Sequence, residues 1–323
     1  MQRREWMRAA AATVCGGAPL AGRAGDFPKA GVPIKYVVPF SAGGLADMVA
    51  RIVGQKLADA WKVPVLVENR PGDSAQAGAE LVAKGPADGS QLLAITLTHV
   101  ANVSLFPKAG YSFVRDLRPV VQLASSPMVV VVPTASSIRS FADLAAAARA
   151  RQLRAGSSGN GTPPHLAMAL FDDLNKSKML HLPYNGGAPS ITDLVEGRLD
   201  VVFSNLPESM AHVKSGRLRA LAICSLGRHP QLPDVPTTLE AGMPGLFVEN
   251  WTGAMIQART PNAIVDRYSR EMVKSLLSAD LEARVLRQGV RLAPKGQDDF
   301  AHFIRAELDR WGRLIRIAKI TAA

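Results

Sequence analysis

The residues able to take part in chemistry gather in two glycine-rich turns, each placed between a short apolar run and a helical pattern. The first turn, "PFSAGG", contains Ser41 and is followed by Asp47 in the first turn of the helix. The second, "GSSGNGTPPH", contains Ser157, Ser158 and His165. Glycine lets a ligand approach backbone amides without a Cβ in the way, and a helix N-terminus adds unpaired N–H groups and partial positive charge. Two such turns facing each other predict a site for an anion, a carboxylate or a phosphate.

Each of these features also has a purely structural interpretation. A glycine pair is common in strand-to-helix turns, and the helix dipole favours an acid such as Asp47 in the first turn of any helix. His165 follows two prolines at a helix start, where a cap or packing role is as good an explanation as ligand contact. Because the turn recurs near residues 42 and 159, a binding site and ordinary strand-to-helix geometry are equally good interpretations of it.

Several reaction classes lack their motifs in this sequence. Phosphate is the less favoured anion, because there is no G-x-x-x-x-G-K-[ST] and "GSSGNG" does not spell G-x-G-x-x-G. The G-x-S-x-G elbow of serine hydrolases is also absent. The six histidines show no metal-ligand spacing; they are His99, His165, His181, His212, His229 and His302. We therefore predict no metal and no cofactor.

The elements that must position the two turns alternate between strand and helix. Apolar residues 36–38 predict a strand, and the spacing of apolar residues between Leu45 and Leu57 predicts one buried helix face. Later, "MVVVVP" predicts a buried strand, and "SFADLAAAARAR" predicts a helix with Ser140 placed as its cap. This alternation is typical of α/β layers around mostly parallel sheets. A length of 323 residues suggests two lobes, with one glycine-rich turn in each.

Residues 1–24 read as an export signal, with a basic start, a weakly apolar Ala/Gly segment and small residues near a cleavage point. Arg3-Arg4 followed by Trp6 resembles a twin-arginine signal, and a Sec signal that holds two arginines fits as well. No apolar stretch reaches the roughly 20 residues of a spanning helix. We therefore expect a soluble chain in the periplasm. Only Cys224 remains after signal removal, so no internal disulfide is expected.

The charge balance argues against nucleic acid as a partner. The formal net charge is +11, and the first 24 residues carry four arginines and one glutamate, which leaves +8 on the mature chain. The remaining Lys and Arg residues are scattered, without the basic stripe and interleaved stacking aromatics that nucleic-acid binding needs. Their modest concentration in the last helix fits a solvated helix face.

Several segments together resemble the receptor family of tripartite tricarboxylate transporters, the Bug-type periplasmic solute-binding proteins. They include "VVPFSAGGLADMVAR", "VLVENRPG", "SSGNGTPPHLA", "LPYNGGAPSITDLVEGRLDVVFSNLP", "LPDVPTTLEAGMPG" and "FVENWTGAM", in order along essentially the whole mature chain. The resemblance implies a two-lobed α/β fold of the periplasmic-binding-protein (Venus flytrap, type II-like) class. It also implies a small carboxylate held in a cleft between the lobes, largely by backbone amides and ordered water. The first turn agrees, since it contains no Arg or Lys to clamp an acid.

Crossovers near Met128 and Val248 divide the chain into lobe 1 (25–127 and 248–323) and lobe 2 (128–247). Carried over by position, the ligand-binding residues are Phe40, Ser41, Ala42, Gly43, Gly44, Asp47, Thr96, Leu97 and Thr98 in lobe 1, and Ser157, Ser158, Gly159, Asn160, Gly161, Thr162, His165, Tyr184 and Asn205 in lobe 2. The sequence departs from the family pattern at three places. "DSAQAG" (73–78) replaces a more glycine-rich run, Ser204 stands where an acid is common, and Val103 stands where proline is usual.

The resulting prediction is a non-enzymatic, monomeric receptor that closes around a mono-, di- or tricarboxylate and presents it to the membrane permease subunits of a tripartite transporter. A ligand that touches both lobes favours the closed state by its extra contacts there. One alternative is a sensor subunit that docks on a membrane kinase. A less favoured one is an α/β hydrolase that uses Ser158 and His165, for which no acid is visibly placed to orient the histidine.

Overall fold

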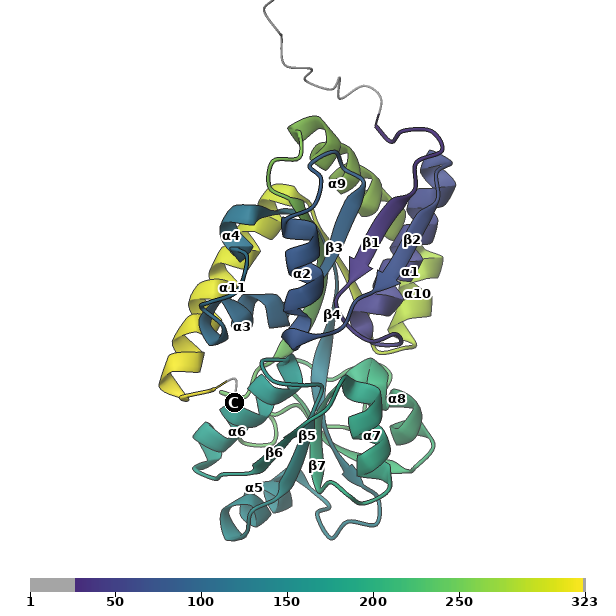
Figure 1. The fold of residues 1–323 in the computed structure, drawn as a ribbon. Coiled ribbons are helices and arrows are strands. Elements are labelled where there is room, and N and C mark those ends of the chain that lie inside the picture. Colours follow the sequence, from purple (N-terminus) through teal and green to yellow (C-terminus); the bar gives the residue numbers. More distant parts are fainter. Residues whose placement is uncertain (1–26, 322–323) are drawn as a thin grey trace, which may run out of the picture.

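One long strand, β4 (Leu117–Pro133), belongs to both halves of the molecule. In the computed structural model, which describes residues 27–321, the strand order is β2-β1-β3-β9-β4-β7-β5-β6, with β10 and β8 also paired to β4. The first part of β4 pairs with β9 (Glu249–Gln257) and β10 (Arg291–Lys295), and the last part pairs with β7 (Val201–Asn205) and β8 (Leu218–Ile223). Figure 1 shows β4 running from the upper half into the lower.

The upper half in Figure 1 combines the N-terminal third of the chain with its C-terminal part. Its remaining strands are β1 (Ile34–Val38), β2 (Val65–Asn69) and β3 (Gln91–Thr96). Its helices are α1 (Leu45–Trp61), α2 (Gln76–Ala83) preceded by a 3-10 turn (Asp73–Ala75), α3 (Leu97–Leu105), α4 (Phe113–Asp116), α9 (Asn262–Leu276), α10 (Ala279–Leu286) and α11 (Gln297–Ile317).

The lower half is built from the middle of the chain. Its other strands are β5 (Arg154–Ser157) and β6 (Leu180–Pro183), and its helices are α5 (Phe141–Ala150), α6 (Pro163–Asn175), α7 (Gly187–Val195) and α8 (Leu206–Lys214). The predicted boundary at residue 128 falls inside β4, and the one at 248 immediately precedes β9. The bounds of the two lobes stay a prediction.

The sheet is mixed, whereas the sequence pattern favoured mostly parallel strands. β1 is parallel to β2 and β3, and β5 is parallel to β6 and β7, as βαβ units require. The pairs that β4 and β9 make are antiparallel, because these two strands carry the chain into the lower half and back. The expectation was wrong for the strands that join the halves.

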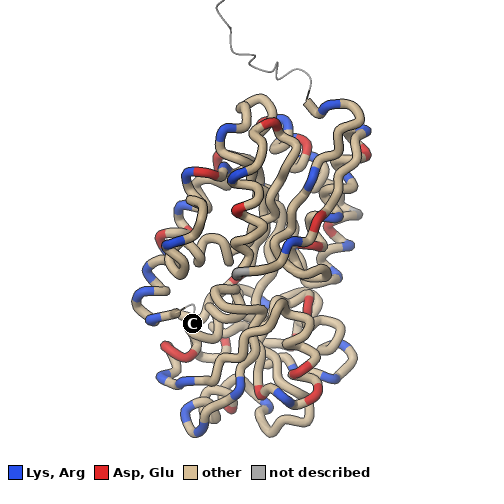
Figure 2. The backbone as a smooth tube through the Cα atoms, viewed as in Figure 1, with Lys and Arg blue, Asp and Glu red and all other residues tan. Residues whose placement is uncertain are grey.

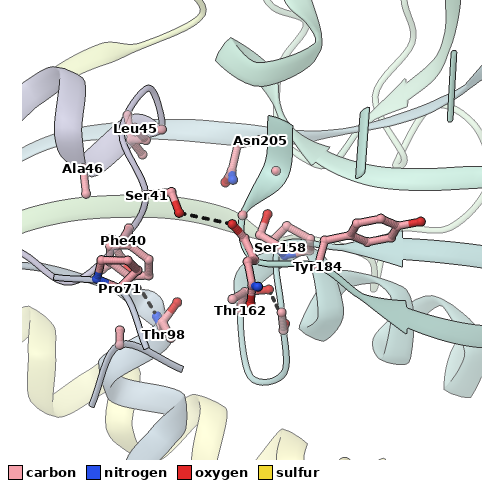
Figure 3. A pocket seen from close by; sticks show the side chains of 18 of the residues that line it. Phe40, Ser41, Leu45, Ala46, Pro71, Thr98, Ser158, Thr162, Tyr184 and Asn205 are labelled. Carbon is pink, nitrogen blue, oxygen red and sulfur yellow. Dashed lines mark hydrogen bonds between the residues drawn. The ribbon is translucent and has the colours of Figure 1, made fainter. Parts of the chain in front are cut away.

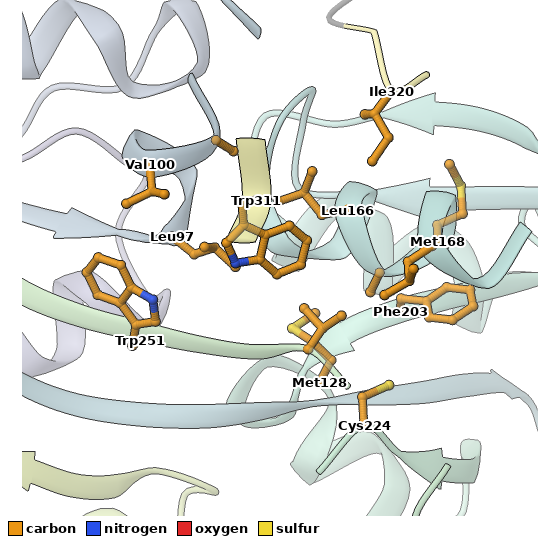
Figure 4. Packing of buried hydrophobic residues seen from close by; sticks show 14 of the residues in the cluster. Leu97, Val100, Met128, Leu166, Met168, Phe203, Cys224, Trp251, Trp311 and Ile320 are labelled. Atoms are coloured by element: carbon orange, nitrogen blue, oxygen red, sulfur yellow. The ribbon is translucent and has the colours of Figure 1, made fainter. Parts of the chain in front are cut away.

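Helices cover both faces of the sheet because side chains alternate along each strand. On β1, Tyr36 and Val38 pack with α1, α9 and α10, whereas Val37 packs on the opposite side with α2 and α3. The apolar cluster that contains Val37 is continuous through both halves, and Figure 4 shows it with Trp251, Leu166 and Phe203. Apolar burial therefore holds the sheet as a rigid frame for the turns at the ends of its strands.

The C-terminal helix α11 is held against β9 by buried hydrogen bonds. Its Glu307 Oε2 accepts hydrogen bonds from the indole nitrogens of Trp251 (2.9 Å) and Trp311 (3.1 Å). Both indoles are buried, so each N–H needs such a partner. Figure 2 shows Lys and Arg positions interleaved with acidic positions along the backbone of both halves. Within residues 27–321 no helix combines the length and apolar character of a membrane span.

Candidate functional site

Six helices begin at the wall of a single cleft between the two halves. The cleft has a volume of about 880 Å³. Three of these helices, α1, α2 and α3, belong to the upper half, and three, α6, α7 and α8, to the lower half. Their N-cap residues all line the cleft: Gly44, Ala75, Thr96, Thr162, Gly186 and Asn205. Each N-terminus carries partial positive charge, so together they favour an anion.

Formal charge in the cleft is nearly absent. Among the described residues that line it there is no Lys, Arg or His, and Glu208 is the one charged side chain. No side chain caps the N-termini of α1, α6, α7 and α8. The donors available to an anion are therefore mainly backbone amides and hydroxyls, as the first turn indicated from the sequence.

In the described part of the wall, some buried polar side-chain atoms have no hydrogen-bond partner. They include Thr98 Oγ1, Ser158 Oγ and Asn250 Oδ1. A buried polar atom without a partner costs free energy, on the order of 1–3 kcal/mol. Thr98 and Asn250 come from the upper half and Ser158 from the lower, so a ligand in the cleft could satisfy atoms from both sides.

The first turn is held from behind by Asp47. Its carboxylate accepts hydrogen bonds from the Gly43 amide (3.0 Å), from Arg51 and from Asn69 Nδ2 (2.9 Å), and Asn69 also donates to the Phe40 carbonyl (3.1 Å). Burial opposes ionisation of Asp47, but these hydrogen bonds outweigh it and keep the pKa of the carboxyl below its usual value. Asp47 does not line the cleft. It positions the turn, and the Gly43 amide is already occupied by it.

The second turn is held by neutral side chains. Ser157 Oγ accepts the Gly159 amide (3.1 Å) and lies 2.6 Å from His181 Nε2, and His165 Nδ1 accepts the Gly161 amide (3.1 Å). The two imidazoles stack with ring centroids 4.0 Å apart. Burial lowers the pKa of His165 to about 3 and that of His181 to about 4, so both rings are neutral at physiological pH.

The cleft brings together thirteen of the eighteen residues carried over from the family pattern. They are Phe40, Ser41, Ala42, Gly43, Gly44, Thr96, Thr98, Ser158, Gly159, Asn160, Thr162, Tyr184 and Asn205. The other five lie behind the wall: Asp47, Leu97, Ser157, Gly161 and His165. Leu97 points into the apolar core, because it follows the Thr96 cap at the start of α3.

Two lining residues use their hydroxyls elsewhere. Thr162 Oγ1 donates to the Gly159 carbonyl (2.6 Å), which closes the second turn on itself. Tyr184 donates to Asp193 (2.7 Å), and Figure 3 shows its hydroxyl pointing away from Ser158 and Ser41. Burial and this hydrogen bond raise the pKa of Tyr184 to about 12. Tyr184 therefore presents its ring and backbone to the cleft.

Direct contacts link the two halves across the cleft. Ser41 Oγ donates to the Asn185 carbonyl (3.2 Å), as the dashed line in Figure 3 marks. Asn250 Nδ2 donates to Asn205 Oδ1 (2.8 Å). These bonds join the first turn to the α7 turn and β9 to the start of α8, so they depend on how closely the halves approach.

Sequence reasoning missed a third glycine turn and one acid. Asn185 and Gly186 precede α7, Gly187 is its first residue, and all three line the cleft. Glu208, in the first turn of α8, lines it as well. The signal was present, since "YNGGAP" repeats the glycine pair before a helix that marked the first turn. Glu208 carried no comparable signal, because an acid in a first helical turn is ordinary.

The geometry does not assemble a hydrolase from Ser158 and His165. Ser158 Oγ has no hydrogen-bond partner, and the His165 nitrogen nearest the turn is occupied by the Gly161 amide. A nucleophile and its base must lie within hydrogen-bond reach of each other. Within the described residues no group of three or more His, Cys, Asp or Glu is placed to hold a metal.

Comparison with known proteins decides the family. Residues 49–320 match the family described as "Tripartite tricarboxylate transporter family receptor". The chain belongs to this receptor family. Its members are periplasmic solute-binding receptors rather than enzymes. The resemblance drawn from the quoted segments is confirmed, and so are the two-lobed α/β fold and the role of a solute receptor of this transporter class.

Individual relatives extend over most of the chain. A "UPF0065 protein in tcbD-tcbE intergenic region" of Pseudomonas sp. (strain P51) is 37% identical over 286 residues, covering 88% of this chain and 85% of the relative. "Protein BugT" of Bordetella pertussis (strain Tohama I / ATCC BAA-589 / NCTC 13251) is 32% identical over 288 residues, 88% of each chain.

Solved structures of similar proteins include two with bound acids. "R. palustris Rpa4515 with adipate" has a TM-score of 0.87 and 31% identity, and covers 92% of this chain and 99% of its own. MatC (Rpa3494) of Rhodopseudomonas palustris, with bound malate, has a TM-score of 0.81 and 28% identity, and covers 88% of this chain and 99% of its own.

Proposed function

We propose that this receptor captures a small organic dicarboxylate, or a closely related acid, in the cleft and delivers it to the permease subunits of a tripartite transporter. The observation that carries the proposal is the convergence of six helix N-termini on a cleft whose described lining contains no Lys or Arg. Such a site suits a carboxylate, which backbone amides bind well. The adipate and malate bound by the two similar receptors are acids of this class.

The cleft suggests how binding drives closure. The first turn and the α1 N-terminus belong to the upper half, and Ser158 and the α7 N-terminus to the lower. A carboxylate resting on α1 meets the second set only when the halves approach. The ligand then favours the closed form by the free energy of those added contacts, which is the form a permease can recognise.

Export precedes this function. Residues 1–24, the predicted signal, lie outside the described residues. We propose that they send the chain to the periplasm by the twin-arginine or the Sec route. Changing Arg3 and Arg4 to Lys separates the two routes, because uncleaved precursor in the cytoplasm indicates the former and normal processing the latter.

Ligand binding is tested by native mass spectrometry of protein taken from the periplasm, followed by thermal-shift titration. The panel pairs each acid with its neutral amide, for example adipate with adipamide and malate with malamide. We expect at least one acid to raise the melting temperature in a saturable way while its amide does not. Equal stabilisation by acid and amide, or none by any mono-, di- or tricarboxylate, contradicts a carboxylate receptor.

A further inference from the structure

The one charged side chain in the described lining of the cleft is an acid, which is unexpected in an anion site. Glu208 lies in the first turn of α8 and faces two helix starts from opposite halves. A Cβ built on Gly187 would lie 1.8 Å from Glu208 Oε2, and one built on Gly44 would lie 3.8 Å from Oε1. The carboxylate thus rests against the α7 start and reaches the N-cap of α1.

Glu208 has unused capacity to accept hydrogen bonds. Its carboxylate accepts one, from Asn205 Nδ2 at 2.9 Å. A carboxylate offers about four acceptor positions, so Glu208, which lines the cleft, can accept further hydrogen bonds there. Desolvation raises the pKa of Glu208 to about 7, and the hydrogen bond from Asn205 offsets this only in part. Tyr184 is the other titratable group in the described lining, and its hydroxyl is committed to Asp193.

Because the described lining holds no Lys, Arg or His to pair with Glu208, a donor group on the ligand is a charge-assisted partner for its carboxylate. A plain dicarboxylate has none to offer, and its second negative charge would lie close to that of Glu208. A hydroxyl or an ammonium group supplies a donor, and the ammonium adds a charge of the opposite sign.

Resting on the proposed carboxylate-receptor function, we propose that Glu208 determines specificity by accepting a hydrogen bond from a hydroxyl or ammonium group on the ligand. The helix N-termini bind a carboxylate of the ligand, and Glu208 accepts a hydrogen bond from the substituent next to that carboxylate. The substrate class is therefore hydroxy- or amino-substituted carboxylic acids, and unsubstituted dicarboxylates bind more weakly.

The test compares acids that differ in one substituent. Isothermal titration at pH 8, where the Glu208 carboxyl is mostly ionised, measures succinate, malate and aspartate, and then adipate, 2-hydroxyadipate and 2-aminoadipate. In at least one series we expect the substituted acids to bind about tenfold to hundredfold more tightly than the unsubstituted one, as befits a hydrogen bond to a charged group.

Variants of Glu208 then assign the preference. Glu208→Gln should weaken binding of the amino-substituted acid about tenfold or more. It should weaken binding of the hydroxy-substituted acid less, because the amide oxygen still accepts a hydrogen bond. The unsubstituted acid should bind as tightly as to the parent or more tightly. Glu208→Ala should erase the preference for both substituents. Glu196→Gln, an exposed change at the far end of α7, is the matched control and should keep the parent's ratios.

The outcomes separate this inference from the function on which it rests. If unsubstituted acids bind the parent as tightly as substituted ones, or if the ratios survive in both Glu208 variants, the role of Glu208 is overturned while the carboxylate receptor stands. If no acid of either series, nor any in the wider carboxylate panel, binds the parent, the proposed function fails and this inference falls with it. If a variant does not fold, the affinities of the unmodified protein for substituted and unsubstituted acids decide whether the inference holds.

Discussion

The two glycine-rich turns look alike in sequence but are built on different physical principles. The first is braced by a charged network of Asp47, Arg51 and Asn69, and opens onto α1, whose first residues keep their amides. The second is braced by neutral Ser157, His165 and His181, and opens onto α6, which starts with two prolines and so lacks two amides. The first turn is therefore suited to donate backbone amides, and the second to offer the Ser158 hydroxyl.

The largest expected effect comes from filling the first turn. Gly44 has ordinary backbone angles (φ −82°), so valine there is not strained, but its side chain would project towards Glu208 across the cleft. Gly44→Val should lower the affinity for the acid that binds most tightly by more than about a hundredfold, or about 3 kcal/mol, as measured by titration calorimetry. Gly227→Val, where the added Cβ meets nothing within 4 Å, is the control. Unchanged affinity in Gly44→Val would remove the first turn from the site.

Removing the charged brace should have the next largest effect. Asp47→Ala leaves the Gly43 amide, Arg51 and Asn69 without their common acceptor, so the turn loses its fixed shape. We expect a drop of about 1–3 kcal/mol in the free energy of unfolding together with weaker ligand binding. Chemical denaturation and calorimetry measure the two. Weaker binding without any loss of stability would indicate that Asp47 contacts the ligand directly.

The neighbouring serines of the second turn should separate binding from stability. Ser158→Ala removes a hydroxyl that has no partner, so the ligand-free protein should keep its stability while affinity falls about fivefold to tenfold. Ser157→Ala removes the partner of the Gly159 amide and of His181, so stability should fall by about 1 kcal/mol. The comparison fails if the two variants behave alike in denaturation and titration.

The last comparison concerns acid sensitivity. The folded-state pKa values of His165 and His181, about 3 and 4, lie below the ordinary 6.5, so the unfolded chain binds more protons below pH 6.5. Stability from these rings is present above pH 6.5 and is lost as pH falls towards 4. The lowered pKa of Asp47 acts only at lower pH, below its ordinary 3.8. His181→Asn should flatten the melting-temperature profile between pH 6.5 and 4, and Asp47→Asn should leave that interval unchanged.

The sequence predicted the frame better than the details of the site. Strand and helix periodicity found the elements around both turns, and β10 was missed because its five residues follow a helix without a clear pattern. The positions of the glycines predicted which backbone segments line the cleft. They could not say that Asp47, Ser157 and His165 face away from the cleft, because side-chain direction depends on partners such as Asn69 and His181 from other strands.

A crystal structure of the protein with the tightest acid of the panel tests the central claim most directly. We predict one carboxylate within about 3 Å of the amides of Leu45 and Ala46, in the first turn of α1 where helix amides have no intrahelical partner. Ser158 Oγ should reach the same ligand from the other half. A ligand bound outside the cleft, or one whose carboxylate is held by a Lys or Arg side chain, would contradict the account.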